Sequence, residues 1–239
     1  MRLIGLLGAK GCGKDTLAKL LIAKLGFVRA SFADALYREV STAYGVAVAF
    51  LENRDTKEKP LRRLALIRCK DRDFVRVALR TLKGLRKDSL KHGLKGKLLD
   101  PFLTARDLLA ARSPRWTMQL WGTEYRRESE FGKDSYWIDQ VEDIIKANPD
   151  VRYVITDVRF VNEAKMVRRY NGALVRVRRP VLEQKEAEAR ARGVSTALHP
   201  SETQMATYPV DFEVVNVEGQ PDLLVTNMSR FIPELSEAT

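Results

Sequence analysis

The sequence predicts an α/β fold in which helices flank a mainly parallel sheet. Five short apolar runs have the pattern of strands, and helix-like segments separate them along the 239 residues. Parallel strands need a crossover connection, so this alternation favours a parallel sheet. Hydrophobic residues make up 45% of the chain, enough for the substantial core of one large domain. The expected strands lie near residues 2–7, 27–32, 151–156, 173–178 and 211–217.

A glycine-rich loop follows the first strand. It fits the pattern G-x-x-x-x-G-K through Gly8, Gly13 and Lys14. The glycines let successive backbone N–H groups point into one concavity, and the next helix adds the partial positive charge of its N-terminus. The loop is therefore predicted to hold a polyphosphate, although Asp15 separates Lys14 from the hydroxyl of Thr16, the residue type that usually binds Mg²⁺. The alternative is a glycine-rich turn that begins a helix without binding a ligand.

The second strand is expected to lead into a helix from Ala33 to Tyr44, which Gly45 ends. Asp34 then lies at the carboxyl edge of the sheet, where open α/β sheets bind their ligands. It could instead serve only as a cap for this helix.

A basic helical insertion is expected over residues 46–115, where no clear strand pattern occurs. Residues 53–115 hold 19 Lys and Arg against 7 Asp and Glu, a balance of +12, whereas the whole chain carries +11. This segment therefore supplies the entire charge excess. It could contact nucleic acid or steer anionic substrates, or it could be a solvated basic surface.

A short helix is expected to begin at Pro114 and to stop at Gly122. Arg115, Gln119 and Gly122 are spaced to share one helical face and its end. A second helix follows, in which Trp137 is either a core residue or a ligand contact.

The strand near 151–156 ends in an acid, Asp157. A buried strand with a terminal carboxylate has the Walker-B pattern, in which the acid acts near Mg²⁺ or near the acceptor. Arg159 and Glu163 follow at the mouth of the strand. The alternative for Asp157 is a helix cap or an ion pair with Arg159. With the phosphate loop, this strand predicts a P-loop NTPase three-layer sandwich.

A charged excursion over residues 179–202 connects the fourth and fifth expected strands. Arg178 and Arg179 lead into a helical stretch from Leu182 to Arg192. An excursion of this kind can act as a lid that excludes water and brings cations to a transferring phosphoryl group. The alternative is a solvated charged helix.

Several function classes are not favoured by the composition. No run of eighteen apolar residues predicts a membrane span, and no signal-peptide pattern precedes the first strand. Cys12 and Cys69 form no disulfide framework, and Cys12 fits the loop by its small size. With only His92 and His199, neither a Ser-His-Asp set nor a zinc cluster is expected. A reducing cytoplasm is the expected compartment.

Short motifs occur in one order along most of the chain. They lie at residues 8–16, 118–124, 136–137, 156–159, 162–164, 177–180 and 199–202. This ordered set resembles the bacteriophage-type deoxynucleoside monophosphate kinases, a branch of the P-loop nucleoside monophosphate kinases. The Lys14-Asp15-Thr16 ending is typical of this branch, so the departure from the general loop supports the resemblance. The basic segment 53–115 matches no motif of the family.

The resemblance implies transfer of the γ-phosphoryl group of ATP to a deoxynucleoside 5′-monophosphate, giving ADP and a deoxynucleoside diphosphate. The chain would be one P-loop kinase domain over 1–239, acting with Mg²⁺ in the cytoplasm, the host's cytoplasm if the chain is of phage origin. A homodimer is plausible by resemblance, and neither nucleic acid nor a membrane is required.

The resemblance also implies a role for each matching residue. The implied ATP contacts are Gly11, Cys12, Gly13, Lys14, Asp15 and Thr16, with Arg178, Arg179, Arg190 and Arg192 as lid cations. The implied acceptor contacts are Lys10, Arg115, Gln119, Gly122, Trp137 and Glu163, and Asp34 joins them as a candidate from its place at the edge of the sheet. The implied catalytic residues are Lys14, Asp15, Asp157 and Arg159, and the implied metal ligands are Thr16 and Asp157.

Two other functions remain open at this point. One is another P-loop small-molecule kinase, such as a phosphomevalonate-kinase-like enzyme with a similar Lys-Asp loop. The other is a nucleic-acid-binding NTPase, which the basic segment 53–115 motivates.

Overall fold

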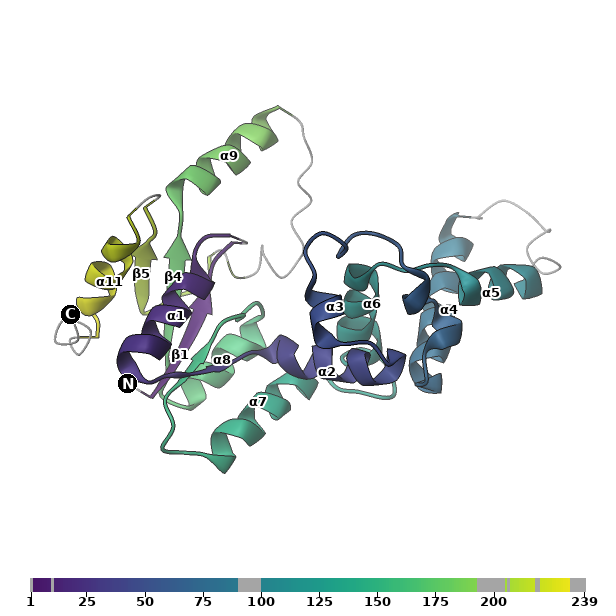
Figure 1. The fold of residues 1–239 in the computed structure, drawn as a ribbon, viewed down its shortest axis with the longest axis horizontal. Coiled ribbons are helices and arrows are strands. Elements are labelled where there is room, and N and C mark those ends of the chain that lie inside the picture. The colour runs from purple at the N-terminus through teal and green to yellow at the C-terminus, as the bar shows by residue number, and fades with distance from the viewer. Residues whose placement is uncertain are drawn as a thin grey trace. The chain divides into compact units, whose positions relative to one another are not determined.

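The computed structural model describes residues 2–9, 11–89, 100–192, 205, 207–217 and 220–232. The chain divides into two compact units (Figure 1). We call Met1–Phe32 with Ile138–Thr239 the core unit and Ala33–Trp137 the helical unit. Within the described ranges, no helix is both long and apolar enough to cross a membrane.

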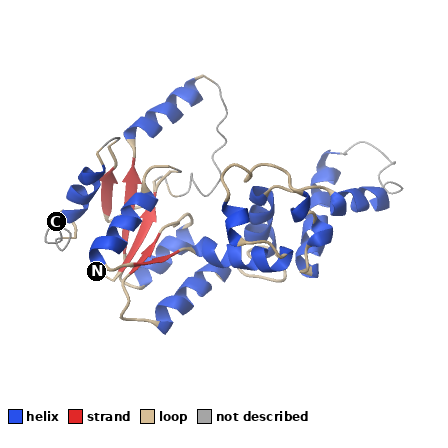
Figure 2. Ribbon diagram, in the orientation of Figure 1, coloured by secondary structure: helices blue, strands red, loops and turns tan. Residues whose placement is uncertain are grey.

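The core unit is built on a five-stranded, all-parallel sheet with the order β2-β3-β1-β4-β5. Its strands are β1 (Leu3–Leu7), β2 (Val28–Ala30), β3 (Tyr153–Ile155), β4 (Ala173–Arg178) and β5 (Phe212–Val215). Its helices are α1 (Lys14–Leu25), α7 (Tyr136–Ala147), α8 (Val161–Arg169), α9 (Pro180–Ala191) and α11 (Pro221–Ser229). The first two residues of α7 belong to the helical unit. Figure 2 shows helices on both sides of the sheet.

The alternation of side chains along β1 explains why the sheet has two covered faces. Ile4 and Leu6 lie in one buried cluster with Leu17 and Leu21 of α1 and Leu224 of α11. On the opposite face Gly5 leaves room for α8, because a Cβ at this position would lie 3.0 Å from the side chain of Val167. The core therefore lies in two layers, one on each side of the sheet.

The helical unit contains no strand among its described residues. Its α-helices are α2 (Phe32–Tyr44), α3 (Val48–Glu52), α4 (Arg72–Ser89), α5 (Asp100–Leu109) and α6 (Pro114–Leu120). Two short 3₁₀ helices, η1 (Arg62–Leu64) and η2 (Leu66–Arg68), precede α4, and a π-helix, η4 (Trp121–Tyr125), follows α6. The aromatic side chains of Phe74, Trp121 and Tyr125 pack together in its interior.

The predicted fold class is confirmed. All five expected strands are present and parallel, although most are shorter than expected. The insertion expected over 46–115 lies inside the helical unit, which begins earlier and ends later.

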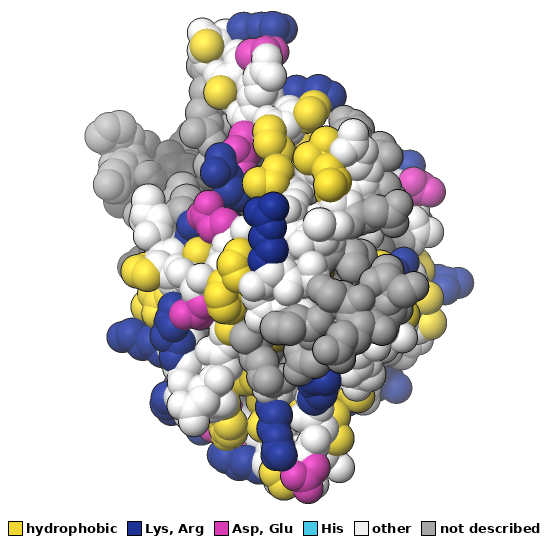
Figure 3. Space-filling view, turned by 90° about the vertical axis from the view of Figure 1, so that its left-hand side faces the viewer, with side chains coloured by type: hydrophobic (Ala, Val, Ile, Leu, Met, Phe, Trp, Pro, Cys, Tyr) yellow, Lys and Arg dark blue, Asp and Glu magenta, His cyan; other side chains and the backbone are white. Residues whose placement is uncertain are grey.

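On the face drawn in Figure 3, the described Lys and Arg side chains are spread among acidic and hydrophobic ones. One expectation was wrong: the helix that begins at Pro114 does not stop at Gly122, because η4 carries the helical chain on to Tyr125.

Candidate active site

The loop between β1 and α1 has the backbone geometry that its glycines predict. Gly8, Gly11 and Gly13 have φ angles of 137°, 80° and 109°, which side-chain-bearing residues rarely adopt. A Cβ at Gly8 would lie 2.3 Å from the carbonyl oxygen of Val177 in β4. The loop is therefore folded tightly against the end of the sheet.

The N-terminus of α1 is suited to an anion. Its N-cap is Gly13, and no side chain accepts a hydrogen bond at this cap. The first N–H groups of a helix lack partners within the helix, and they carry its positive partial charge. Asp15 and Thr16 in the first turn are exposed. The end of the helix is thus open to a phosphate group, and the loop residues fit a polyphosphate.

The ammonium group of Lys14 lies in the curve of the loop. Its Nζ donates hydrogen bonds to the carbonyl oxygens of Gly8, at 2.6 Å, and Ala9, at 2.8 Å. Nζ is also 3.7 Å from Sγ of Cys12, which is buried. Among the described loop residues, Lys14 alone carries a full positive charge, and its ammonium group lies where the predicted phosphates would bind. Lys10, predicted to face the acceptor, lies outside the described residues.

Asn216, just after β5, holds the loop from the other side. Its Nδ2 donates a hydrogen bond of 2.9 Å to the carbonyl oxygen of Cys12. The same nitrogen lies 2.3 Å from the position that a Cβ on Gly13 would take, so Gly13 is needed for this approach as well as for its φ angle. Sequence reasoning missed Asn216, and the only available signal was a polar residue at the carboxyl end of a strand.

Asp157 lies at the end of β3, as expected for the Walker-B pattern. Its carboxylate accepts hydrogen bonds from Ser31 Oγ, at 2.8 Å, and from the backbone N–H of Phe32, at 3.0 Å. Phe32 is the first residue of α2, so Asp157 caps this helix, although from a distant part of the chain. The helix cap that was the alternative role for Asp157 is therefore present. This role is compatible with a further role for the same carboxylate.

Glu163 has a local structural role. Its side chain is buried, and Oε2 accepts hydrogen bonds from the backbone N–H groups of Arg159, at 2.8 Å, and Phe160, at 3.1 Å. These bonds satisfy N–H groups at the start of α8. The Arg159 residue itself is exposed. The structure thus brings Arg159 and Glu163 together, through the backbone of the former.

The two arginines at the end of β4 differ in their partners. Arg178 makes a bidentate ion pair with Glu183, with distances of 2.9 and 2.7 Å, and this contact raises the pKa of the guanidinium. Arg179 instead donates from Nη1 to the carbonyl oxygen of Gly11 at 3.2 Å. Arg179 is therefore the one of the two that contacts the phosphate loop in the described residues. The side chain of Arg190 and residues 193–202 of the predicted lid lie outside what the structure describes.

Gly122 and Trp137 are part of the packing of the helical unit. A Cβ on Gly122 would lie 3.3 Å from the side chain of Leu36, so the glycine permits close approach of η4 to α2. The indole Nε1 of Trp137 donates to the carbonyl oxygen of Gly122 at 3.0 Å, and Trp137 is only 3% exposed. This burial favours a packing role for Trp137 over contact with a ligand.

The other residues predicted on the acceptor side lie on two helices of the helical unit. Arg115, on α6, forms an ion pair with Glu58, and its backbone N–H donates to Lys57. Gln119, on the same helix, is exposed. Asp34 lies in the first turn of α2 and is half-buried.

Glu39 of α2 forms a cluster that sequence reasoning did not find. Its carboxylate accepts hydrogen bonds from Trp121 Nε1 at 2.8 Å, Arg126 Nε at 2.8 Å and the hydroxyl of Tyr136 at 2.5 Å. The guanidinium of Arg126 also lies 4.4 Å from the ring centroid of Tyr125. We call these five residues the Glu39 cluster. Burial, and then the bond to Glu39, raises the pKa of Tyr136 to about 12.

Metal-binding groups are not assembled in the described part of the chain, where no three His, Cys, Asp or Glu residues come together. The two predicted ligands, Thr16 and Asp157, are both in the core unit. A hydroxyl and a carboxylate are oxygen ligands of the type that Mg²⁺ takes beside substrate phosphates, so the chemistry of the predicted pair fits this ion.

Two proteins from viruses align with nearly the whole chain. A deoxynucleoside-5′-monophosphate kinase of Escherichia phage T5 is 30% identical, covering 90% of this chain and 89% of its own length. A protein of Acanthamoeba polyphaga mimivirus, provisionally named a deoxynucleotide monophosphate kinase, is 28% identical over 92% of this chain and 90% of its own.

Two further comparisons add no support for an activity. No protein-family model matches the chain. The crystal structure of TT1252 from Thermus thermophilus aligns over 99% of this chain and 97% of its own, at 16% identity and a TM-score of 0.40.

Proposed function

The chain belongs to the deoxynucleoside monophosphate kinase family, and from this premise we propose how it transfers the γ-phosphoryl group of ATP to a deoxynucleoside 5′-monophosphate. The products are ADP and a deoxynucleoside diphosphate. The observation that carries the proposal is the phosphate loop, in which an open helix N-terminus and the Lys14 ammonium converge on one concavity.

Lys14 and the loop bind and orient the donor. The transferring phosphoryl group carries its charge on three oxygens, and catalysis depends mainly on alignment and on neutralising that charge. Lys14 and the first N–H groups of α1 supply fixed positive charge at this position, and Arg179 adds a further guanidinium beside Gly11. The backbone of Gly11, Cys12 and Gly13 forms the wall of the cradle.

Mg²⁺ is part of the proposal, with Thr16 and Asp157 as the residues that would hold it. When bound, Mg²⁺ neutralises phosphate charge and fixes the geometry of the phosphate chain. Asp15 at the start of α1 would then bind indirectly, through the cation or its water. Removal of divalent cations with a chelator should abolish transfer.

The acceptor contacts remain those that the resemblance implies. We propose that Arg115 and Gln119 bind the monophosphate nucleotide, with Asp34 at the start of α2 and Lys10 also contributing. Gly122 and Trp137 contribute indirectly, because they set the packing of η4 on which this part of the helical unit depends. Glu163 positions Arg159 by accepting a hydrogen bond from the backbone N–H of Arg159. We further propose that residues 179–202 act as a lid, that the enzyme acts in the cytoplasm and that it forms a homodimer.

A coupled assay of ADP release, run over all the deoxynucleoside and ribonucleoside monophosphates, tests the proposal. We expect ADP formation that depends on at least one deoxynucleoside monophosphate. Slow ATP hydrolysis that no monophosphate stimulates would contradict it. Stimulation by DNA or RNA alone would favour a nucleic-acid-dependent NTPase, and activity only with phosphomevalonate would favour the other small-molecule kinase.

A further inference from the structure

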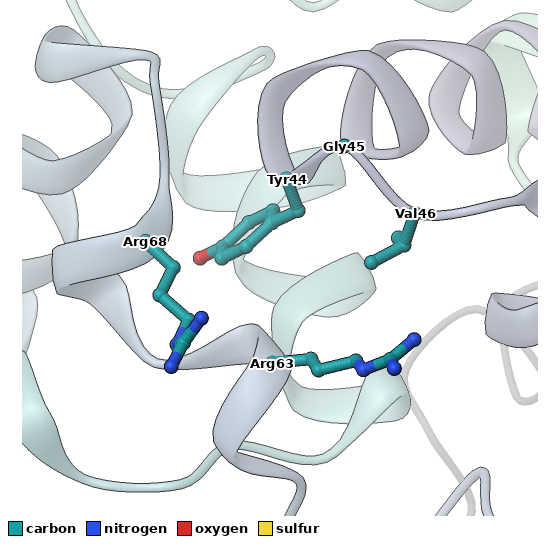
Figure 4. Close-up of a pocket in the computed structure, with 5 residues that line it drawn as sticks. All are labelled: Tyr44, Gly45, Val46, Arg63 and Arg68. Carbon is teal, nitrogen blue, oxygen red and sulfur yellow. The ribbon is translucent and has the colours of Figure 1, made fainter.

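A pocket of about 420 Å³ opens at the C-terminal end of α2, within the helical unit (Figure 4). It is lined by Tyr44, Gly45, Val46, Arg63 and Arg68. Its volume lies in the range of pockets that take small organic ligands. Figure 4 shows two arginines from the segment of η1 and η2: Arg68 lies beside the ring of Tyr44, and the side chain of Arg63 extends below Val46.

The pocket carries positive charge that no carboxylate in the described part of the chain neutralises. Arg63 and Arg68 are exposed, and neither forms an ion pair with any residue that the structure describes. The guanidinium carbon of Arg63 is 6.0 Å from the ring centroid of Phe50, at the limit of a cation–π contact. A third cation is close by, because Nζ of Lys70 lies 4.0 Å from the position of a Cβ on Gly45.

Arginines elsewhere in the same unit show the contrast. Arg76 pairs with Asp73 at 3.0 Å, and Arg80 pairs with Glu130 at 2.8 Å. Both of these arginines of α4 are exposed, yet each has a carboxylate partner. Two arginines that line one pocket and have no carboxylate partner among the described residues favour an external anion, and the fork geometry of a guanidinium suits phosphate oxygens.

The remaining walls of the pocket are apolar. Tyr44 is 7% exposed and packs edge-on against Phe74, and burial raises the pKa of its phenol, so it stays neutral. Val46 adds an aliphatic surface beside it. A pocket lined by both cationic and apolar side chains suits an organic phosphate better than a bare inorganic ion.

We propose that this pocket binds the phosphate tail of a nucleotide, at the opposite end of α2 from Asp34. Asp34 and Tyr44 are ten residues apart on α2, or about 15 Å, so the pocket lies apart from this proposed acceptor contact. The preference for an anion comes from Arg63 and Arg68. The choice of a nucleotide rests on the proposed function, because nucleotides are the organic phosphates that such an enzyme meets.

The test uses the full chain with Lys14→Ala, which weakens binding at the phosphate loop. Each of the four deoxynucleoside triphosphates is titrated in turn by calorimetry. We expect binding that falls roughly tenfold or more when Arg63→Ala and Arg68→Ala are added. The matched control is Arg76→Ala with Arg80→Ala, which removes the same charge from the same unit and should leave affinity unchanged.

Several results would overturn the proposal. It is wrong if no triphosphate binds, or if both double variants weaken binding equally. Inorganic tripolyphosphate that binds as tightly as the nucleotides would remove the nucleotide assignment. A single-stranded DNA oligomer that binds through Arg63 and Arg68 more tightly than any nucleotide would replace it with a nucleic-acid surface. Kinase activity is assayed separately on the unmodified chain, so failure here leaves the proposed function untouched, and the converse also holds.

Discussion

The phosphate loop and the Glu39 cluster are organised in opposite ways. In the loop, residues that are neighbours in sequence take their positions from backbone geometry, through Gly8, Gly11 and Gly13. In the Glu39 cluster, the partners are far apart along the chain: Glu39 is 82 residues from Trp121 and 97 from Tyr136. A local motif predicts the first arrangement, whereas only tertiary packing can produce the second.

The two regions also differ in role: the phosphate loop is built to bind a ligand, whereas the Glu39 cluster stabilises the fold. The loop places N–H groups and an ammonium at an open helix end, where a ligand can reach them. In the Glu39 cluster the polar groups hydrogen-bond to one another, and the carboxylate of Glu39 links α2 to η4 and α7. Changes in the loop should therefore act mainly on activity, and changes in the cluster mainly on stability.

The largest expected effect is that of Lys14→Ala. Removing the loop's ammonium should lower kcat/KM roughly 10³-fold, as for loss of a preorganised charged donor, with little change in the free energy of unfolding. The control is Lys19→Ala, an exposed lysine on the same helix. Steady-state ADP release measures both variants, and equal activities would mean that the loop does not hold the donor.

The second effect concerns Glu39→Ala. It leaves the Trp121 indole, the Arg126 guanidinium and the Tyr136 hydroxyl without their shared acceptor, so the free energy of unfolding should fall by about 3 kcal/mol. Urea unfolding followed by tryptophan fluorescence gives this value. Glu52→Ala, at an exposed position of α3, is the control. A change as small as that of the control would show that the cluster does not hold the unit together.

The sequence predicts the local parts of this molecule well. The five strands, the loop and the acid at the end of β3 all follow from short apolar runs and motif spacing. The strand order does not, because apolar runs do not say which strands pair. The Asn216 contact with Cys12 spans 204 residues. The π-helix that continues the chain through Gly122 lies close to Leu36 of α2, a tertiary contact that no local pattern predicts.

Asn216→Ala sharpens the comparison, because this contact supports the loop from a distant strand. Loss of its bond to the Cys12 carbonyl should lower kcat/KM for ATP roughly tenfold by loosening the loop. Asn227→Ala is a matched control, since the Asn227 amide donates to Val215 and not to the loop. Equal kinetics for the two variants would make Asn216 a packing residue only.

The smallest expected effect separates the two arginines after β4. Arg179→Ala should raise the KM for ATP roughly fivefold, because Arg179 contacts Gly11 in the loop. Arg178→Ala should change it less, since Arg178 is paired with Glu183. A larger effect at Arg178 would mean that this pair opens when the nucleotide binds.

The central claim is that the phosphate loop delivers a phosphoryl group to a deoxynucleoside monophosphate. The most direct test incubates the unmodified chain with Mg²⁺, a deoxynucleoside monophosphate and ATP that carries radioactive phosphorus in its γ-phosphoryl group, and separates the products by chromatography. We expect the label in the deoxynucleoside diphosphate, at a rate that falls with Lys14→Ala. Label found only in inorganic phosphate would contradict the account.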